Sequence, residues 1–281
     1  MAESPSAILR RHGLRPKKAW GQNFLGDDYH LSSIADAAHV GKGEAVVELG
    51  AGLGHLTRHL ARAGAHIVAV ERDRDLVPIL RAEMEGLDVD VREANAATID
   101  LHEIAREAGR KLTVVGNLPY HLSTEILFHV EAQRADLARA VFLLQKEVTE
   151  RIAAAPGGKS YGVLSVLLQL HADVDVPHHV PAGVFTPPPE VESAVVRLTF
   201  RDAPRADPGD EAFFRRLVKA AFAQRRKTLG NALKSARLVE AEALQAGFAA
   251  AGIDPGRRAE TLAVEEFAAL SRALAPAARA G

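Results

Sequence analysis

The chain contains no cysteine among its 281 residues. Disulfides, thiolate zinc sites, iron–sulfur clusters and cysteine nucleophiles are therefore excluded together. The absence also excludes any enzyme that methylates C5 of a pyrimidine through thiolate attack on the ring. We expect no metal centre in this protein.

Long apolar runs and a large net charge are lacking as well. The N-terminal residues have no apolar secretion signal, and no later stretch approaches the roughly 18 apolar residues of a membrane span. We therefore expect a cytoplasmic protein that does not bind membranes. Hydrophobic residues make up 47% and charged residues 25% of the chain, as in folded globular proteins. The length predicts one large domain and a smaller one.

The formal net charge of −1 argues against a nucleic-acid partner, but the basic residues are unevenly distributed. Residues 1–25 contain five Lys or Arg against only Glu3, and residues 212–237 contain eight with no Asp or Glu. Such runs are usually solvated helix faces. Beside a nucleotide site they become candidate phosphate contacts, foremost Arg225, Arg226 and Lys227.

Short apolar runs alternate with helical stretches between about residues 44 and 145. This alternation predicts a doubly wound α/β domain, with a parallel sheet and helices on both faces. We expect strands at 44–49, 66–70, 87–91, 112–115 and 140–144, and crossover helices at 53–63, 74–85 and 123–131.

The C-terminal part has a different pattern. A proline cluster precedes a strand expected at 191–200, and a linker rich in Pro, Asp and Gly follows at 201–210. Beyond it the periodicity predicts a small helical domain, with helices at 210–222, 226–236, 239–251 and 263–274. We therefore divide the chain into domains 1–200 and 201–281.

A glycine-rich turn follows the first predicted strand at Gly50, Gly52 and Gly54, and Glu71 follows Gly50 by 21 residues. Glycines let a ligand approach the backbone at the carboxyl edge of the sheet, and an acidic residue at this spacing accepts ribose hydroxyls. The glycine-rich turn and Glu71 together suit NAD as well as S-adenosylmethionine. The pattern G-x-G-x-G favours S-adenosylmethionine, because no diphosphate is cradled. Asn95 would then bond the cofactor's adenine, or else belong to a turn.

The sequence Asn117-Leu118-Pro119-Tyr120 ends the fourth predicted strand. An adenine amino group is a poor nucleophile, because its lone pair is conjugated with the ring. The Asn117 side-chain oxygen and the Leu118 carbonyl could both accept from this group and hold it for attack on a sulfonium methyl. Tyr120 offers a face on which an extruded base can stack. A proline turn with a core tyrosine is the alternative.

Together these motifs resemble the KsgA family of ribosomal RNA adenine dimethyltransferases, close relatives of the Erm methyltransferases. The resemblance covers nearly the whole chain. Its matching stretches are GQNFL (21–25), VVELGAGLGHLT (46–57), VERD (70–73), VVGNLPYHLST (114–124), LLQKEVTERI (143–152), YGVLSVLLQ (161–169), FTPPPEVESAVVRL (185–198) and RRKTLGNAL (225–233).

The resemblance implies a class I S-adenosylmethionine-dependent methyltransferase with a Rossmann-like sheet. The implied cofactor positions are Asn23, Leu25, Gly50, Glu71, Asn95 and Asn117. Relatives often have Asp where this chain has Asn95, so we expect somewhat weaker cofactor binding. By the same likeness, Phe185 would flank the target base opposite Tyr120, although an aromatic before prolines is more often a core residue.

The implied reaction is N6,N6-dimethylation of two adjacent adenosines near the 3′ end of small-subunit (16S) ribosomal RNA. The partner would be the assembling 30S subunit, the role ribosome biogenesis, and the protein a monomer. An Erm-type enzyme would instead modify one adenosine of large-subunit RNA and confer macrolide resistance. Further alternatives are a non-catalytic ribosome-assembly or transcription factor on the same fold, and an NAD-dependent oxidoreductase.

Overall fold

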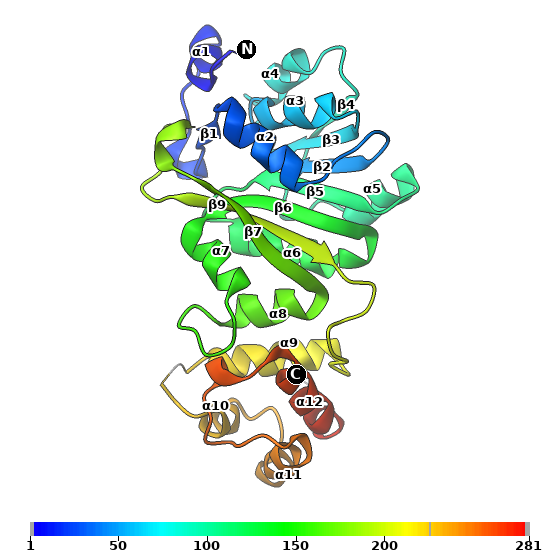
Figure 1. The fold of residues 1–281 in the computed structure, drawn as a ribbon, viewed down its shortest axis with the longest axis vertical. Coiled ribbons are helices and arrows are strands. Elements are labelled where there is room, and N and C mark those ends of the chain that lie inside the picture. The colour runs from blue at the N-terminus through cyan, green and yellow to red at the C-terminus, as the bar shows by residue number, and fades with distance from the viewer. Residues whose placement is uncertain (1–2, 225, 279–281) are drawn as a thin grey trace. The chain divides into compact units, whose positions relative to one another are not determined.

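A seven-stranded sheet is the largest element of the structure, a computed structural model that describes residues 3–224 and 226–278 (Figure 1). Neighbouring strands follow the order β4-β3-β2-β5-β6-β9-β7. The pairs from β4 to β6 are parallel, and β9 joins β6 in the antiparallel direction. The strands span β2 Ala45–Leu49, β3 His66–Glu71, β4 Val89–Glu93, β5 Leu112–Asn117, β6 Leu137–Gln145, β7 Ala172–Val180 and β9 Ser193–Phe200.

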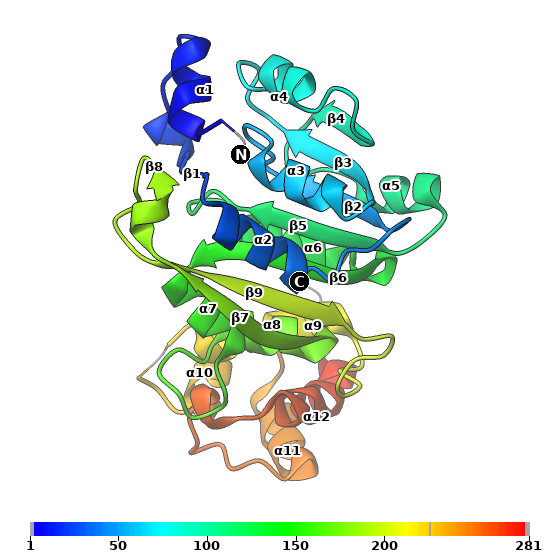
Figure 2. The same ribbon diagram turned by 45° about the horizontal axis from the view of Figure 1, so that its top comes forward.

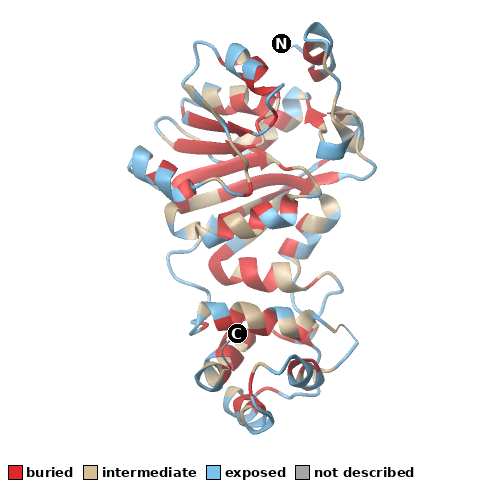
Figure 3. Ribbon diagram, turned by 180° about the vertical axis from the view of Figure 1, so that it is seen from behind, coloured by how far each residue is buried: buried red, intermediate tan, exposed pale blue. Residues whose placement is uncertain are grey.

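The five strands expected between residues 44 and 145 all form and run parallel, which confirms the doubly wound α/β prediction. Residues of β2, β3 and β5 are almost all buried (Figure 3), because helices cover both faces of a parallel sheet. The largest difference in bounds is at β6, which begins at Leu137 rather than at residue 140.

Two groups of helices cover the sheet. The helices α2 (Asp28–Ala37), α3 (His55–Arg62) and α4 (Val77–Glu83) share a hydrophobic core with one face. On the opposite face lie α5 (Leu101–Ala108) and α6 (Ser123–Ala132) (Figure 2). Right-handed crossovers require this arrangement, since the chain runs outward from β2 to β4 and then returns to continue from β5 to β6. The strand order therefore reverses between β2 and β5, where open α/β sheets bind their ligands.

Two further strands extend the sheet beyond β6. The strand expected at 191–200 forms as β9, whereas no strand was expected at β7, which contains Pro177. A proline is tolerated in β7 because this strand is the last in the sheet and leaves one edge unpaired. A separate two-stranded sheet pairs β1 (Phe24–Leu25) with β8 (Phe185–Thr186).

The chain divides into two compact units. The first extends to residue 149 and includes 174–200, and the second comprises 150–173 and the residues from 201 on. The sequence had placed everything up to residue 200 in the first domain. Residues 150–173 fall in the second unit because α8 (Val163–His171) packs against the C-terminal helices. The remaining helices are α1 (Pro5–Arg11), α7 (Lys146–Ala153), α9 (Glu211–Phe222), α10 (Leu229–Ala236), α11 (Ala241–Ala251) and α12 (Val264–Leu274).

The helices expected in the second unit all form, and the largest difference in bounds is at the start of α10. The sequence placed the beginning of α10 at residue 226, but the helix begins at Leu229. Thr228 ends the preceding turn in extended conformation, and its side chain accepts from the Asn231 N–H as an N-cap. Across both described stretches of the chain, no helix has the length and apolar character needed to cross a membrane.

Candidate active site

A cavity of about 230 Å³ opens at the carboxyl ends of β2, β3, β4 and β5. It therefore lies at the reversal of strand order between β2 and β5. Five stretches contribute most of its lining, namely 19–25, 50–53, 70–72, 94–96 and 117–122. The cavity brings together every cofactor position expected from the sequence and the whole of the 117–120 motif.

The glycine loop after β2 needs its glycines for backbone conformation and for space. Gly50, Gly52 and Gly54 have φ angles of +77°, +57° and +81°, values that side chains strongly disfavour. A Cβ on Gly52 would lie 3.2 Å from the Phe24 ring, and one on Gly54 would lie 2.6 Å from Met84. Gly50 and Gly52 line the cavity, whereas Gly54 serves packing against the helix beneath.

Glu71, at the end of β3, is bonded to this loop. Its carboxylate accepts from the backbone N–H groups of Gly52 (2.8 Å), Arg72 (2.8 Å) and Asp73 (2.7 Å). Burial raises the pKa of Glu71, and these backbone hydrogen bonds oppose the rise. A carboxylate offers about four acceptor sites, so about one remains for a ribose hydroxyl beside these three hydrogen bonds.

Asn95 lines the cavity after β4 and also forms a turn. Its side-chain oxygen accepts from the Ala97 N–H at 3.1 Å, and its carbonyl accepts from Thr98 and Ile99. Both interpretations of this residue from the sequence are therefore compatible with its position. The second lone pair of the amide oxygen and the amide N–H groups remain for a ligand.

Asn117 ends β5, and its amide has a defined orientation. The side-chain nitrogen donates to the Asn23 carbonyl at 3.0 Å, so the side-chain oxygen is the free acceptor. The next residue, Leu118, donates its N–H to the Leu143 carbonyl at 3.3 Å. Its own carbonyl accepts no hydrogen bond from the described residues. Among the described residues, two acceptors without a hydrogen-bond partner thus follow one another at the end of β5, and their role toward an amino group stays a prediction.

Tyr120 lies after Pro119 on the same side of the cavity. It is half-buried, and its hydroxyl lies 2.8 Å from that of Ser193, the first residue of β9. Burial raises the pKa of the Tyr120 phenol, with the Ser193 hydrogen bond acting against the rise, so the hydroxyl stays protonated. Ser193 was not predicted as a partner of Tyr120.

Phe185 does not line the cavity. Its side chain is only 3% exposed and packs in the core with Leu25 and Leu31, while its backbone pairs with Leu25 in the β1–β8 sheet. The structure therefore supports the core interpretation of Phe185 and not the expected contact with a target base. Asn23 and Leu25, by contrast, do line the cavity.

Glu48 is a cavity residue that our sequence analysis missed. It lies within β2, is only 2% exposed, and one of its carboxyl oxygens, Oε2, reaches no hydrogen-bond partner in the described part of the chain. Burial raises the pKa of Glu48 to about 8; the nearby Thr57 hydroxyl opposes this rise and the Glu71 carboxylate adds to it. An acidic residue inside an otherwise apolar strand was the signal that could have identified it.

The basic cluster expected to contact RNA belongs to the second unit. Arg226 and Lys227 are exposed in the turn before α10, and Arg225 lies outside the described residues. Both described side chains are open to solvent, and a phosphate contact requires such an accessible cation.

Comparison with known proteins gives consistent matches over almost the full length. Residues 13–275 match the family described as ribosomal RNA adenine dimethylase. The chain is 56% identical, over 98% of its length and 96% of the relative's, to a ribosomal RNA small subunit methyltransferase A of Myxococcus xanthus. A protein of the same name from Geobacter metallireducens is 47% identical over 95% and 98% of the two chains.

Solved structures share the fold at lower identity. A dimethyladenosine transferase from Plasmodium falciparum superimposes with a TM-score of 0.73 at 23% identity, over 88% of this chain and 95% of that one. The 23S ribosomal RNA methyltransferase ErmE gives a TM-score of 0.69 at 23% identity, over 90% and 100% of the two chains. Both confirm the expected Rossmann-like sheet with a C-terminal helical region.

Proposed function

The chain belongs to the ribosomal RNA adenine dimethylase family, and from this premise we propose that it transfers methyl groups from S-adenosylmethionine to N6 of two adjacent adenosines near the 3′ end of small-subunit ribosomal RNA. The observation that carries the proposal is the meeting of two sets of groups in one cavity. The glycine loop with Glu71 suits a ligand with ribose hydroxyls, and Asn117 with Leu118 suits an amino group.

The cavity residues fit S-adenosylmethionine, which supplies an electrophilic methyl group when bound. Its cationic character matches the unpartnered buried oxygen of Glu48, a group that is costly to leave without a positive or hydrogen-bonding partner. The Gly52 backbone provides the close approach that a side chain would prevent. We propose that the cofactor is held by Asn23, Leu25, Gly50, Gly52, Glu71, Asn95 and Asn117.

Asn117 and Leu118 are the groups that prepare the adenosine for reaction. We assign the Asn117 side-chain oxygen and the Leu118 carbonyl as acceptors for the two N–H bonds of the amino group, since neither has a hydrogen-bond partner in the described part of the chain. Holding both N–H bonds turns the nitrogen lone pair out of the ring plane and stabilises the positive charge that develops on nitrogen. A monomethylated amino group keeps one N–H, so one acceptor still serves the second transfer.

Pro119 and Tyr120 position the base. The fixed φ of Pro119 directs the chain from the acceptors to the tyrosine, and the Tyr120 ring gives an extruded adenine a stacking face. The Ser193 hydroxyl fixes the far end of that ring. Phe185 has no part in this proposal, because it is buried away from the cavity.

We propose that the RNA partner binds to the basic turn of the second unit. Arg226 and Lys227 are exposed cations suited to phosphates, with no base specificity of their own. A substrate in the small ribosomal subunit places the protein in the cytoplasm, acting on the subunit during assembly.

The test is methylation of both ribosomal RNAs by the purified protein. Small-subunit RNA, partly assembled small subunits and large-subunit RNA are each incubated with S-adenosylmethionine, then digested for mass spectrometry and mapped by primer extension. We expect N6,N6-dimethyladenosine at two adjacent small-subunit positions, and none with Asn117→Ala over the same time. Methylation confined to large-subunit RNA, or transfer to another atom, would contradict the proposal.

A further inference from the structure

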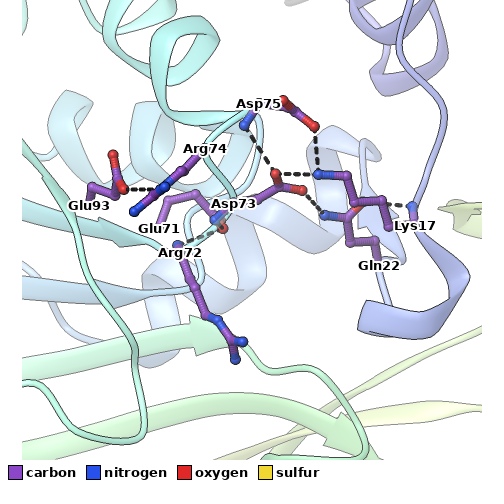
Figure 4. Close-up of polar contacts among 8 residues, drawn as sticks. All are labelled: Lys17, Gln22, Glu71, Arg72, Asp73, Arg74, Asp75 and Glu93. Atoms are coloured by element: carbon purple, nitrogen blue, oxygen red, sulfur yellow. Dashed lines mark hydrogen bonds and ion pairs between the residues drawn. The ribbon is translucent and has the colours of Figure 1, made fainter.

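Asp73 lies two residues beyond Glu71 and is almost completely buried, at 1% exposure. Its carboxylate accepts from Lys17 Nζ at 2.6 Å and from Gln22 Nε2 at 2.7 Å (Figure 4). The backbone N–H of Asp75 donates a third hydrogen bond at 3.1 Å. Burial alone would raise the pKa of Asp73, but the three hydrogen bonds outweigh it and keep the pKa below its usual value. Asp73 is therefore a fixed anion that holds a segment distant in sequence.

The segment from Lys17 to Gln22 has an internal hydrogen bond in addition to its bonds with Asp73. The Gln22 side-chain oxygen accepts from the Lys17 backbone N–H at 2.8 Å, while its nitrogen donates to Asp73. The Trp20 ring is in contact with two cations, with Lys17 Nζ and Arg72 Cζ at 5.1 and 5.0 Å from its centroid. These contacts give the segment one defined conformation at the end of β3.

The residue after Gln22 makes the contact that orients Asn117. The Asn23 carbonyl accepts from the Asn117 side-chain nitrogen at 3.0 Å. This hydrogen bond decides which end of the amide is left for a substrate, since without it either the oxygen or the NH2 group could face the cavity. An NH2 group in that place would repel an adenine amino group instead of accepting from it.

We propose that Asp73 is a positioning residue for methyl transfer: through Lys17 and Gln22 it holds the Asn23 carbonyl in the place where that carbonyl orients the Asn117 amide. The inference rests on the proposed function, because it gives Asn117 the role of acceptor. It also links the two halves of the cavity, since Asp73 lies two residues after the proposed ribose acceptor Glu71 and donates its backbone N–H to that carboxylate at 2.7 Å.

The test is single-turnover methylation with saturating cofactor and RNA, using Asp73→Asn, Asn117→Ala and the double variant. Asp73→Asn keeps the shape but loses the charge, and its NH2 group replaces one carboxylate oxygen, so it meets either the Lys17 donor or the Gln22 donor. We expect a loss of rate on the order of 10-fold or more from Asp73→Asn alone. In the Asn117→Ala background the same change should have an effect of less than about 2-fold, because the group it positions is gone. RNA affinity should stay near the wild-type value.

Two further variants keep the result interpretable. Gln22→Ala leaves the Lys17–Asp73 ion pair and should lower the rate in the same non-additive way, which matters if Asp73→Asn does not fold. Arg74→Ala is the matched control, because Arg74 is in the same stretch but is 86% exposed and pairs only with Glu93 among the described residues. It should keep the wild-type rate.

The outcomes separate this inference from the proposed function. If Asp73→Asn slows Asn117→Ala by the same factor as it slows the wild type, Asp73 acts independently of Asn117 and the inference is overturned. If Asn117→Ala itself reacts at the wild-type rate, the proposed role of Asn117 is overturned and the inference with it.

Discussion

The Tyr120 hydroxyl lies 2.8 Å from the hydroxyl of Ser193, a side chain that is completely buried at the start of β9. Tyr120→Ala removes the stacking face and should weaken docking of the base by about 1–3 kcal/mol. Tyr120→Phe keeps the face but leaves the Ser193 hydroxyl unpaired, so we expect a loss of only a few-fold in kcat/KM. Steady-state kinetics with a ribosomal RNA substrate measures both.

The Ser193 contact supplies its own control. Ser193→Ala should lower kcat/KM about as much as Tyr120→Phe, and combining the two should cost no more than either alone, because each removes the same hydrogen bond. A Phe variant as inactive as the Ala variant would give the hydroxyl a chemical role that the present account does not include.

Gly52→Val should abolish most cofactor binding. The residue has φ +57°, which a β-branched side chain strongly disfavours, and a Cβ would meet the Phe24 ring at 3.2 Å within the cavity. Calorimetry with S-adenosylmethionine should find affinity reduced at least 100-fold, as expected when a loss exceeds about 3 kcal/mol. Gly86→Val is the matched control, since Gly86 has φ +79° with nothing within 4 Å of a Cβ. It should lose stability but keep its affinity, and equal affinities in the two variants would exclude the loop from the cofactor site.

Local sequence was sufficient for the parts of the site that follow directly from strand ends. Gly50, Glu71 and Asn117 each end or directly follow a strand of the parallel sheet, and the carboxyl ends of such strands meet at one edge. Their meeting in one cavity therefore required only the order of strands. The strand β7 did not follow from local sequence, because its Pro177 is tolerated only at the edge of a sheet, and local sequence does not show which strand lies at the edge.

Contacts between distant segments could not be predicted. Nothing near Lys17 in the sequence indicates that it pairs with Asp73, and the Asn23–Asn117 bond joins residues 94 positions apart. Phe185 shows the opposite error, since resemblance suggested a role at the base and packing with Leu25 decided its position. Motifs and resemblance predicted which residues belong to the site, whereas the orientation of each side chain depends on tertiary packing.

Replacing Arg226 and Lys227 together by alanine should weaken RNA binding without altering the site of methylation. Both are exposed cations in a unit separate from the cavity, so their contribution is to phosphate binding. Binding measured from low to high salt should give a slope reduced by about 0.7–0.9 for each lost phosphate contact. Arg62→Ala, an exposed residue of α3, should leave the slope unchanged. An unchanged slope in the double variant would mean that this turn is only a solvated surface.

The buried carboxyl of Glu48 should make the free energy of unfolding fall as the pH rises. Burial raises its pKa from 4.5 to about 8 in the folded protein. Between these values the unfolded chain releases a proton that the folded protein keeps, so the unfolded state binds fewer protons and unfolding becomes easier with increasing pH. Below the unfolded pKa both states are protonated, and above the folded pKa both are ionised, so the effect is confined to that window.

Glu48→Gln removes this ionisation while keeping the shape, and thermal unfolding without cofactor should find the variant increasingly more stable than the wild type from pH 5 to 8. The difference should amount to a few kcal/mol, since one pKa unit corresponds to about 1.36 kcal/mol and relaxation around the charge reduces the total. A stability difference that stays constant across this range would mean that Glu48 is already ionised in the folded protein.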